Sequence, residues 1–100
     1  MATFIMLTKL SSSVSHTAPN LEELERSAVD HVRRQCPNVR WLHSYAVLGR
    51  PDYVDVFTAP DIETAMKVSA LVRTFGAADT EVWPAVEWEQ FRTIVRSLER

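Results

Sequence analysis

The stretch LGRPDYVDVFTAPD, from Leu48 to Asp61, decides the fold. Its apolar, β-branched run VDVF at 54–57 is typical of a strand. The tripeptide GRP at 49–51 is a turn signal, because glycine accepts positive φ and proline has no N–H to donate to a ladder. Asp61 is a preferred helix N-cap. The stretch therefore predicts the end of one strand, a three-residue hairpin loop, a second strand and the start of a helix.

Apolar periodicity outside this stretch predicts the remaining elements. In chain order we expect a strand at 2–10, a helix from Asn20 to the CPN stop at 36–38, strands at 40–48 and 52–58, a helix at 62–75 ended by Gly76, a strand at 79–86 and a helix at 87–98. This order predicts one α+β domain over residues 1–100, with a ferredoxin-like βαββαβ arrangement and an added C-terminal helix. The sheet is expected to have four antiparallel strands, with both long helices on one face.

Composition excludes several classes of protein. The formal net charge of -2 and the lack of a basic patch argue against a nucleic-acid partner. Cys36 is the only cysteine, so no intramolecular disulfide can form, which fits a reducing compartment. The apolar start is too short for a signal peptide or a membrane span. We therefore expect a cytoplasmic protein without a membrane partner.

Motifs for metals and cofactors are missing from the sequence. It contains no HExxH motif, no clustered Cys and His spacing, no GxGxxG motif and no P-loop. We accordingly expect neither a metal nor a cofactor.

The two sides of the predicted sheet differ in chemistry. One is aliphatic and is expected to pack beneath the helices; it carries Ile5, Leu7, Leu42, Ala46, Leu48, Val54, Val56 and Val82. The other is rich in rings and is expected to face away from the helices; it carries Phe4, Met6, Trp41, His43, Tyr45, Val47, Tyr53, Asp55, Phe57 and Trp83.

The ring-rich side is expected to bind a second copy of the chain. Its six aromatic side chains would expose about 900 Å², more than a monomer usually tolerates. Covering that area would yield on the order of 20 kcal/mol, against an association cost of about 4–15 kcal/mol. We therefore expect a homodimer formed through this sheet face.

The best candidate for chemistry is a cluster of His43, Tyr45 and Asp55. A three-residue hairpin loop would place Tyr45 opposite Asp55 and His43 diagonally from it. A histidine beside a carboxylate can act as a general base, and a nearby tyrosine can donate to an oxyanion. The same residues could equally form a hydrogen-bonded polar island within the dimer contact.

Four further residues are weaker candidates for ligand binding: Asp52, Tyr53, Arg73 and Trp83. Arg73 could pair with an anionic ligand in the cleft between sheet and helix, and Trp83 could stack on a flat ligand. Their alternatives are a turn residue for Asp52, a surface ion pair for Arg73, and packing for Trp83.

Five segments carry a family resemblance: FIMLTKL at 4–10, SYAVLG at 44–49, DVFTAPD at 55–61, LVRTFGAADTEVW at 71–83 and WEQF at 88–91. Together they resemble the GYD-domain family of small dimeric α/β-barrel proteins. The resemblance implies a ferredoxin-like protomer and a dimer of two sheets. Gly49 and Asp52 match the glycine and aspartate that name the family, whereas Pro51 occupies the tyrosine position and Tyr53 follows the aspartate.

The function expected from these features is binding of a small, partly aromatic or anionic metabolite in the α/β cleft of a homodimer. One alternative is a cofactor-independent oxygenase, isomerase or decarboxylase with His43 as base, Tyr45 as oxyanion donor and Asp55 as orienting group. The wider dimeric α/β-barrel group includes enzymes of this kind, a fold-level analogy. A second alternative is a structural assembly subunit.

Overall fold

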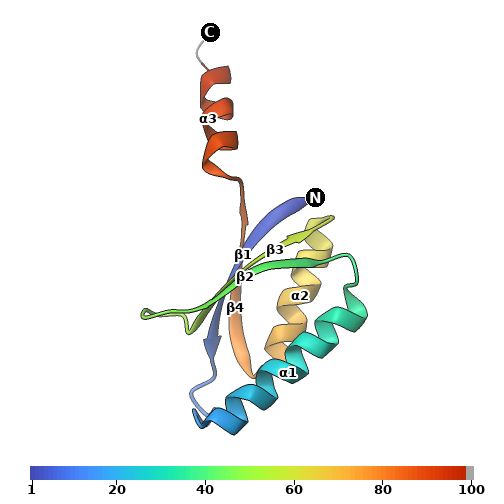
Figure 1. Cartoon of the computed structure of the whole chain (residues 1–100), viewed down its shortest axis with the longest axis vertical. Helices are drawn as coiled ribbons and strands as arrows, with labels where there is room; N and C mark the ends of the chain where they lie inside the picture. The colour runs from blue at the N-terminus through green and yellow to red at the C-terminus, as the bar shows by residue number, and fades with distance from the viewer. Residues whose placement is uncertain (99–100) are drawn as a thin grey trace.

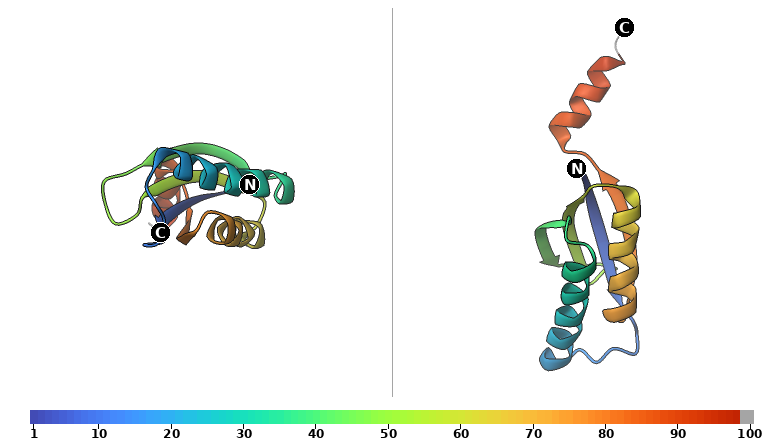
Figure 2. Two further views of the ribbon diagram at one scale, coloured as in Figure 1. Left: turned by 90° about the horizontal axis from the view of Figure 1, so that it is seen from below. Right: turned by 90° about the vertical axis from the view of Figure 1, so that its right-hand side faces the viewer.

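A computed structural model describes residues 1–98 and has the predicted order of elements. These are β1 (Ala2–Leu10), α1 (Ala18–Gln35), β2 (Arg40–Ala46), β3 (Tyr53–Ala59), α2 (Ile62–Phe75), β4 (Ala78–Ala85) and α3 (Trp88–Ser97). The strands form one antiparallel sheet in the order β2-β3-β1-β4. Helices α1 and α2 lie side by side on one face of it (Figures 1 and 2). The α+β, ferredoxin-like prediction is confirmed.

Helix α2 begins and ends where local chemistry predicts. The Asp61 side chain accepts a hydrogen bond from the backbone N–H of Thr64 at 2.7 Å, as an N-cap should. At the other end, a Cβ on Gly76 would lie 2.6 Å from the carbonyl oxygen of Val72, so only glycine fits there. The chain then turns through Ala77, which has a φ of 50°.

Helix α1 begins at Ala18, earlier than the predicted start at Asn20. Pro19 lies in the first turn, where its missing N–H costs nothing. Asn20 therefore lies within the helix, and its side-chain amide donates to the carbonyl oxygen of Ser15 at 2.7 Å.

The hairpin between β2 and β3 differs from the predicted three-residue loop. The last paired residues are Ala46 and Tyr53, so the loop comprises residues 47–52. Asp52 is held by β1 instead of facing Leu48: its N–H donates to the carbonyl oxygen of Thr8, and its Oδ2 accepts from the N–H of Leu10, both at 2.8 Å. These bonds fix β3 against β1. Across the hairpin Asp52 faces Val47, whose N–H donates to the carbonyl oxygen of Asp52 at 3.1 Å. Residues 43–46 of β2 therefore pair with β3 one residue out of the predicted register, which puts His43 and Tyr45 on the opposite side of the sheet from Asp55.

The predicted assignment of the sheet faces was wrong for β1 and β3, whereas His43, Tyr45 and Trp83 lie on the face without helices, as predicted. Phe4 pairs with Phe57 and Met6 with Asp55, and these side chains face the helices. Phe57 and Met6 are 0% and 1% exposed. The aliphatic side chains expected in the core, Ile5 and Leu7 of β1 and Val54 and Val56 of β3, alternate with them and therefore lie on the face without helices.

The helices supply the reason for this arrangement. Their buried positions against the sheet include small residues, among them Ala28 of α1 and Ala65 and Ser69 of α2. Small side chains on the helices leave volume that large rings must fill to reach the packing density of a protein interior. Phe57 stacks between Phe4 and Trp41, with ring centroids 5.7 Å and 5.2 Å away. Phe4 and Phe57 are thus core residues, whereas Trp41 packs on Phe57 but remains 38% exposed.

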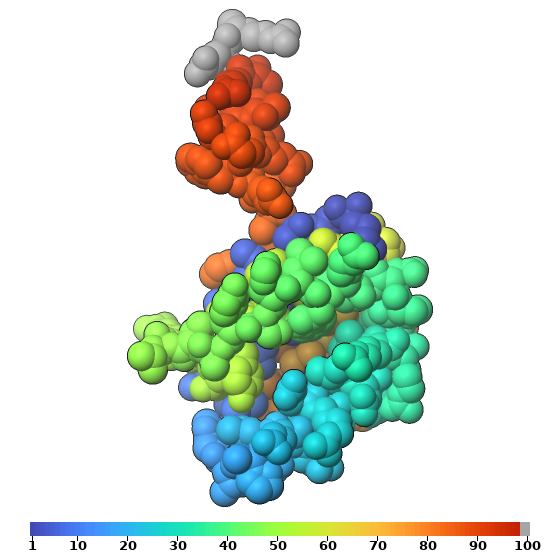
Figure 3. Space-filling model, in the orientation of Figure 1, coloured from blue at the N-terminus to red at the C-terminus, as the bar shows by residue number. Residues whose placement is uncertain are grey.

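Helix α3 projects from the end of β4, away from the sheet and the other two helices (Figures 1 and 3). None of its side chains is buried, although it is strongly amphipathic. Its exposed apolar residues are Trp88, Phe91, Ile94, Val95 and, at its C-cap, Leu98. A helix of 10 residues is marginal in water without packing, so α3 needs a surface to cover it.

Candidate functional site

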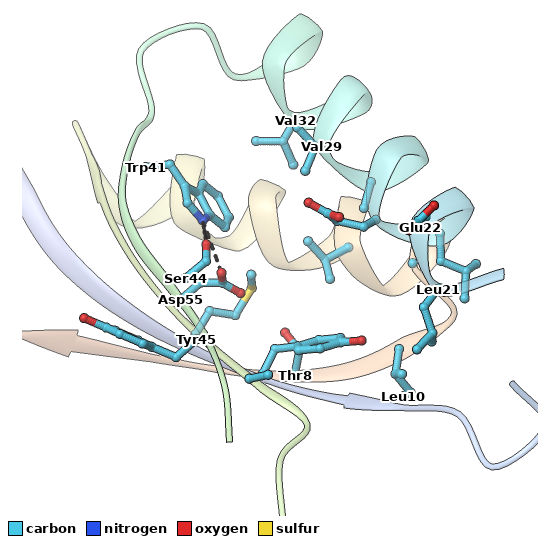
Figure 4. A pocket seen from close by; sticks show the side chains of 18 of the residues that line it. Thr8, Leu10, Leu21, Glu22, Val29, Val32, Trp41, Ser44, Tyr45 and Asp55 are labelled. Atoms are coloured by element: carbon cyan, nitrogen blue, oxygen red, sulfur yellow. Dashed lines mark hydrogen bonds between the residues drawn. The ribbon is translucent and has the colours of Figure 1, made fainter. Parts of the chain in front are cut away.

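A cavity of about 650 Å³ lies between α1 and the β1–β3–β2 side of the sheet. The space-filling view shows the surface hollowed between α1 and β2 (Figure 3), and Figure 4 shows the side chains that surround the space. Most of the lining is apolar and comes from the sheet, α1, α2 and the connection between α1 and β2: Met6, Leu10, Leu21, Leu24, Ala28, Val29, Val32, Val39 and Val72. Both the size and this composition are typical of small-molecule sites.

The cavity exists because α1 does not pack directly on the strands along its whole length. Its later turns reach the core through Ala28 and Val32, which are buried. Its early turns carry Leu21 and Leu24 over the sheet, where both remain only half-buried. The apolar side of α1 therefore serves two purposes. Ala28 and Val32 at its end close the core, and Leu21 and Leu24 at its start line the cavity.

The polar wall of the cavity consists of Trp41 and Ser44 from β2 and Asp55 from β3 (Figure 4). The indole Nε1 of Trp41 donates to Ser44 Oγ at 2.8 Å and to Asp55 Oδ1 at 3.2 Å. Residues three apart on a regular strand point to opposite faces. An irregularity in β2 between Trp41 and His43 adds one residue and brings Trp41 and Ser44 to the same side.

Electrostatics set the protonation tendencies of two cavity residues. Burial raises the pKa of the Asp55 carboxyl, and hydrogen bonds from Ser44 and Trp41 oppose that rise. Burial also raises the pKa of Tyr53, followed by the negative charges of Asp52 and Glu25. Since an unperturbed tyrosine already titrates near pH 10, Tyr53 is a neutral phenol at physiological pH.

Comparison with known proteins identifies the family. Residues 4–95 match the family described as GYD domain. The chain belongs to the GYD-domain family. Among solved structures, it is similar to muconolactone isomerase, determined by crystallography at 3.3 Å resolution, with a TM-score of 0.57 and 18% sequence identity over 85% of this chain and 88% of the other. At that identity the likeness supports the fold alone, which is the ferredoxin-like fold predicted from the sequence. No curated protein matched the sequence.

The predicted cluster of His43, Tyr45 and Asp55 is not formed in this GYD domain. His43 pairs with Val56 and Tyr45 with Val54, so both rings belong to the face without helices, whereas Asp55 faces the helices. The two rings stack with centroids 6.0 Å apart, and Tyr45 is 55% exposed. Tyr45 also borders the cavity, but its ring points away from α1 (Figure 4). The shifted register explains the separation.

The four weaker candidates lie in different places. Tyr53 lines the cavity. Asp52 ties the end of β1 to the hairpin and lies 3.8 Å from Lys9 Nζ. Arg73 borders a separate hollow of about 180 Å³ between α2 and β4, where its Nε donates to Thr80 Oγ1 at 3.1 Å. Trp83 lies on the face without helices. Only Tyr53 joins Asp55 in the main cavity.

Sequence reasoning missed the partners of Asp55. It treated Trp41 as a packing or stacking residue and gave Ser44 no role. Neither glycine nor proline marks the irregularity near Leu42 that brings these two side chains together, so no local signal could have revealed it.

Among residues 1–98, no group of three or more His, Cys, Asp or Glu side chains is arranged to hold a metal ion. Within the same range, no helix combines the length and apolarity needed to span a bilayer.

Proposed function

We propose that this GYD-domain protein is a homodimer that binds a compact, largely apolar metabolite between α1 and the sheet. The observation that carries the proposal is the cavity of about 650 Å³, whose lining is mostly apolar. The exceptions are the polar wall, the hydroxyl-bearing side chains of Thr8, Tyr45 and Tyr53, and a few charged side chains. Binding sites for small molecules usually combine such a lining with a few polar groups that orient the ligand.

The homodimer rests on the sheet face without helices. That face carries Ile5, Leu7, Val54 and Val56 together with the rings of His43, Tyr45 and Trp83. An apolar sheet face is stable when another layer covers it, and a two-fold axis lets the same patch cover itself. The argument for a dimer that was made from the sequence therefore still applies, but the set of residues on the covered face has changed.

Helix α3 supports the same assembly. It projects beyond its own sheet with its apolar residues uncovered (Figure 2). A second protomer placed on the sheet face would offer α3 a surface that its own chain does not supply. Covering α3 would also stabilise a helix that is too short to persist alone.

The ligand-binding proposal is tested by filling the cavity. A library of compact aromatic and alicyclic compounds, both neutral and charged, is screened by thermal shift and confirmed by calorimetry. Leu24→Trp places a bulky ring in the cavity from α1, whereas Arg26→Trp places the same ring on the exposed side of that helix. We expect the wild type to bind one compound per chain, Arg26→Trp to bind alike, and Leu24→Trp to lose at least about tenfold in affinity, or about 1.4 kcal/mol. Equal binding by both variants, or no ligand for the wild type, would refute the proposal.

A further inference from the structure

We propose that Asp55 is the polar anchor of the cavity and that it selects uncharged ring compounds bearing a hydroxyl group over carboxylates of the same shape. The inference rests on the proposed function and names the ligand class for that site. Of the partly aromatic or anionic metabolite expected from the sequence, it keeps the aromatic alternative and drops the anionic one.

The first step is the free hydrogen-bonding capacity of Asp55. An ionised carboxylate offers about four acceptor sites. Trp41 and Ser44 are the donors that reach it within residues 1–98. Asp55 lines the cavity, so its remaining capacity is directed at whatever occupies that space. A hydroxyl donating to a carboxylate forms a charge-assisted hydrogen bond, stronger than one between neutral groups.

The second step is the fixed position of the wall. The Trp41 ring lies flat on Phe57, with an interplanar angle of 11°, and Phe57 is fully buried. The indole N–H is therefore held in place by packing, and it keeps Asp55 Oδ1 oriented without help from a ligand. An anchor whose orientation is already set binds its ligand with a smaller entropic cost.

The third step is the charge of the lining. Glu22, Glu25 and Asp55 contribute carboxylates, against a single guanidinium from Arg33. A ligand carboxylate beside Asp55 would meet a like charge and could not donate a hydrogen bond to it. The apolar side chains of Leu21, Leu24 and Val29 on α1 line the same cavity and would contact the ring; Figure 4 shows Leu21 and Val29 on the α1 side of the space, across from Asp55. The hydroxyl end therefore belongs at Asp55 and the ring beneath α1.

The test compares three probes of one shape near neutral pH: 2-naphthol, its methyl ether and 2-naphthoate. Binding to the full chain is followed by NMR, including the indole N–H resonance of Trp41. We expect 2-naphthol to bind at least about tenfold more tightly than either other probe, the factor expected from a hydrogen bond to a charged group. In Asp55→Asn we expect that advantage to shrink by a similar factor.

A matched control comes from the opposite face of the sheet, where Trp83 Nε1 donates to Glu81 Oε1 at 3.0 Å. Glu81→Gln removes a charge of the same kind, from the same type of Trp–carboxylate pair, outside the cavity. We expect it to bind all three probes as the wild type does.

Three outcomes overturn the inference: equal affinities for 2-naphthol and its ether, unchanged selectivity in Asp55→Asn, or no binding of 2-naphthol at all. They are distinguishable from failure of the proposed function. If all three probes bind alike and Leu24→Trp excludes them, the cavity is a binding site and only the proposed role of Asp55 is refuted.

Discussion

Trp41 and Asp55 are joined across β2 and β3 by a hydrogen bond from the indole Nε1 to Oδ1 at 3.2 Å. Fourteen positions separate them in the sequence, and neither is a direct cross-strand partner of the other, since Trp41 pairs with Phe57 and Ser44 with Asp55. The contact forms the polar wall of an otherwise mostly apolar cavity. Its consequences can be measured without knowing the ligand.

Replacing Trp41 with phenylalanine is expected to raise the pKa of Asp55. Burial already raises the pKa of this carboxyl, and hydrogen bonds from Ser44 and Trp41 hold the rise in check. Trp41→Phe keeps a ring against Phe57 but removes the donor. The carboxyl ¹³C shift of Asp55, titrated against pH, measures the change. Trp83→Phe serves as control, because its indole bonds Glu81 on the other face; an Asp55 titration that does not move in Trp41→Phe would contradict the prediction.

Asp55→Asn is expected to stabilise the folded chain near neutral pH. Because burial raises the pKa of Asp55, the folded state holds this proton more tightly than the unfolded state. The stability gained from that proton is fully present below the ordinary aspartate pKa of about 3.9 and is lost as pH rises through the raised folded value. Urea midpoints measured across this range should therefore converge at low pH and separate as pH rises, with the variant more stable.

Asp61 is expected to make stability depend on pH in the opposite direction. The pKa of its carboxyl is lowered by hydrogen bonds from the side chain and backbone of Thr64, so its contribution is present above the ordinary pKa and lost as pH falls through the lowered one. Asp61→Asn should then be less stable than the wild type near neutral pH. If both variants are stabilising, the assignment of Asp61 is contradicted; if both are destabilising, the assignment of Asp55 is contradicted.

The reversed sheet faces are tested by adjacent residues of β1. Met6 is buried beneath the helices, so Met6→Ala should lower the free energy of unfolding by about 2–5 kcal/mol. Ile5 faces the other way, and Ile5→Ala should cost less at low protein concentration. If the sheet face is a dimer contact, the Ile5→Ala effect should change with protein concentration whereas the Met6→Ala effect persists in the monomer. Denaturant unfolding at several concentrations measures both. A larger effect for Ile5 in the monomer would refute the observed alternation.

Two substitutions in the turn after α2 should change the stability of the fold in opposite directions. Gly76→Ala places a Cβ 2.6 Å from the carbonyl oxygen of Val72 and should destabilise by about 1–3 kcal/mol. Ala77 has a φ of 50°, a left-handed conformation that costs a residue with a Cβ roughly 1–2 kcal/mol. Ala77→Gly should thus stabilise by about 0.5–1 kcal/mol after the extra unfolded-state entropy of glycine. Thermal unfolding of the two variants provides the comparison, and a stabilising Gly76→Ala would contradict it.

Charge on the face without helices is expected to separate the proposed dimer. Val56→Glu places a carboxylate among apolar neighbours on that face, and burying an unpaired charge is costly. Light scattering after size exclusion should give twice the chain mass for the wild type and 11.4 kDa for the variant. Ala70→Glu, on the exposed side of α2, should remain dimeric. A wild type that already has the single-chain mass would exclude the dimer.

Local chemistry alone was enough for the elements and their order, whereas the family was identified from the resemblance of five sequence segments. The Asp61 cap, the glycine stop at Gly76 and the alternating strands depend on neighbours in the chain, so they could be predicted from the sequence. Three residues that line the cavity, Tyr45, Tyr53 and Asp55, were also among the predicted candidates. The position of Tyr53 and Asp55 beside the apolar first turns of α1 was not predicted.

Tertiary packing decided the rest. Both faces of the sheet are apolar, so alternation could not tell which one the helices cover; small residues on α1 and α2, such as Ala28 and Ala65, favoured the rings. The hairpin pairs Ala46 with Tyr53, one residue out of the predicted register. That one residue placed His43 on one face and Asp55 on the other, because side chains on a strand alternate with a period of two.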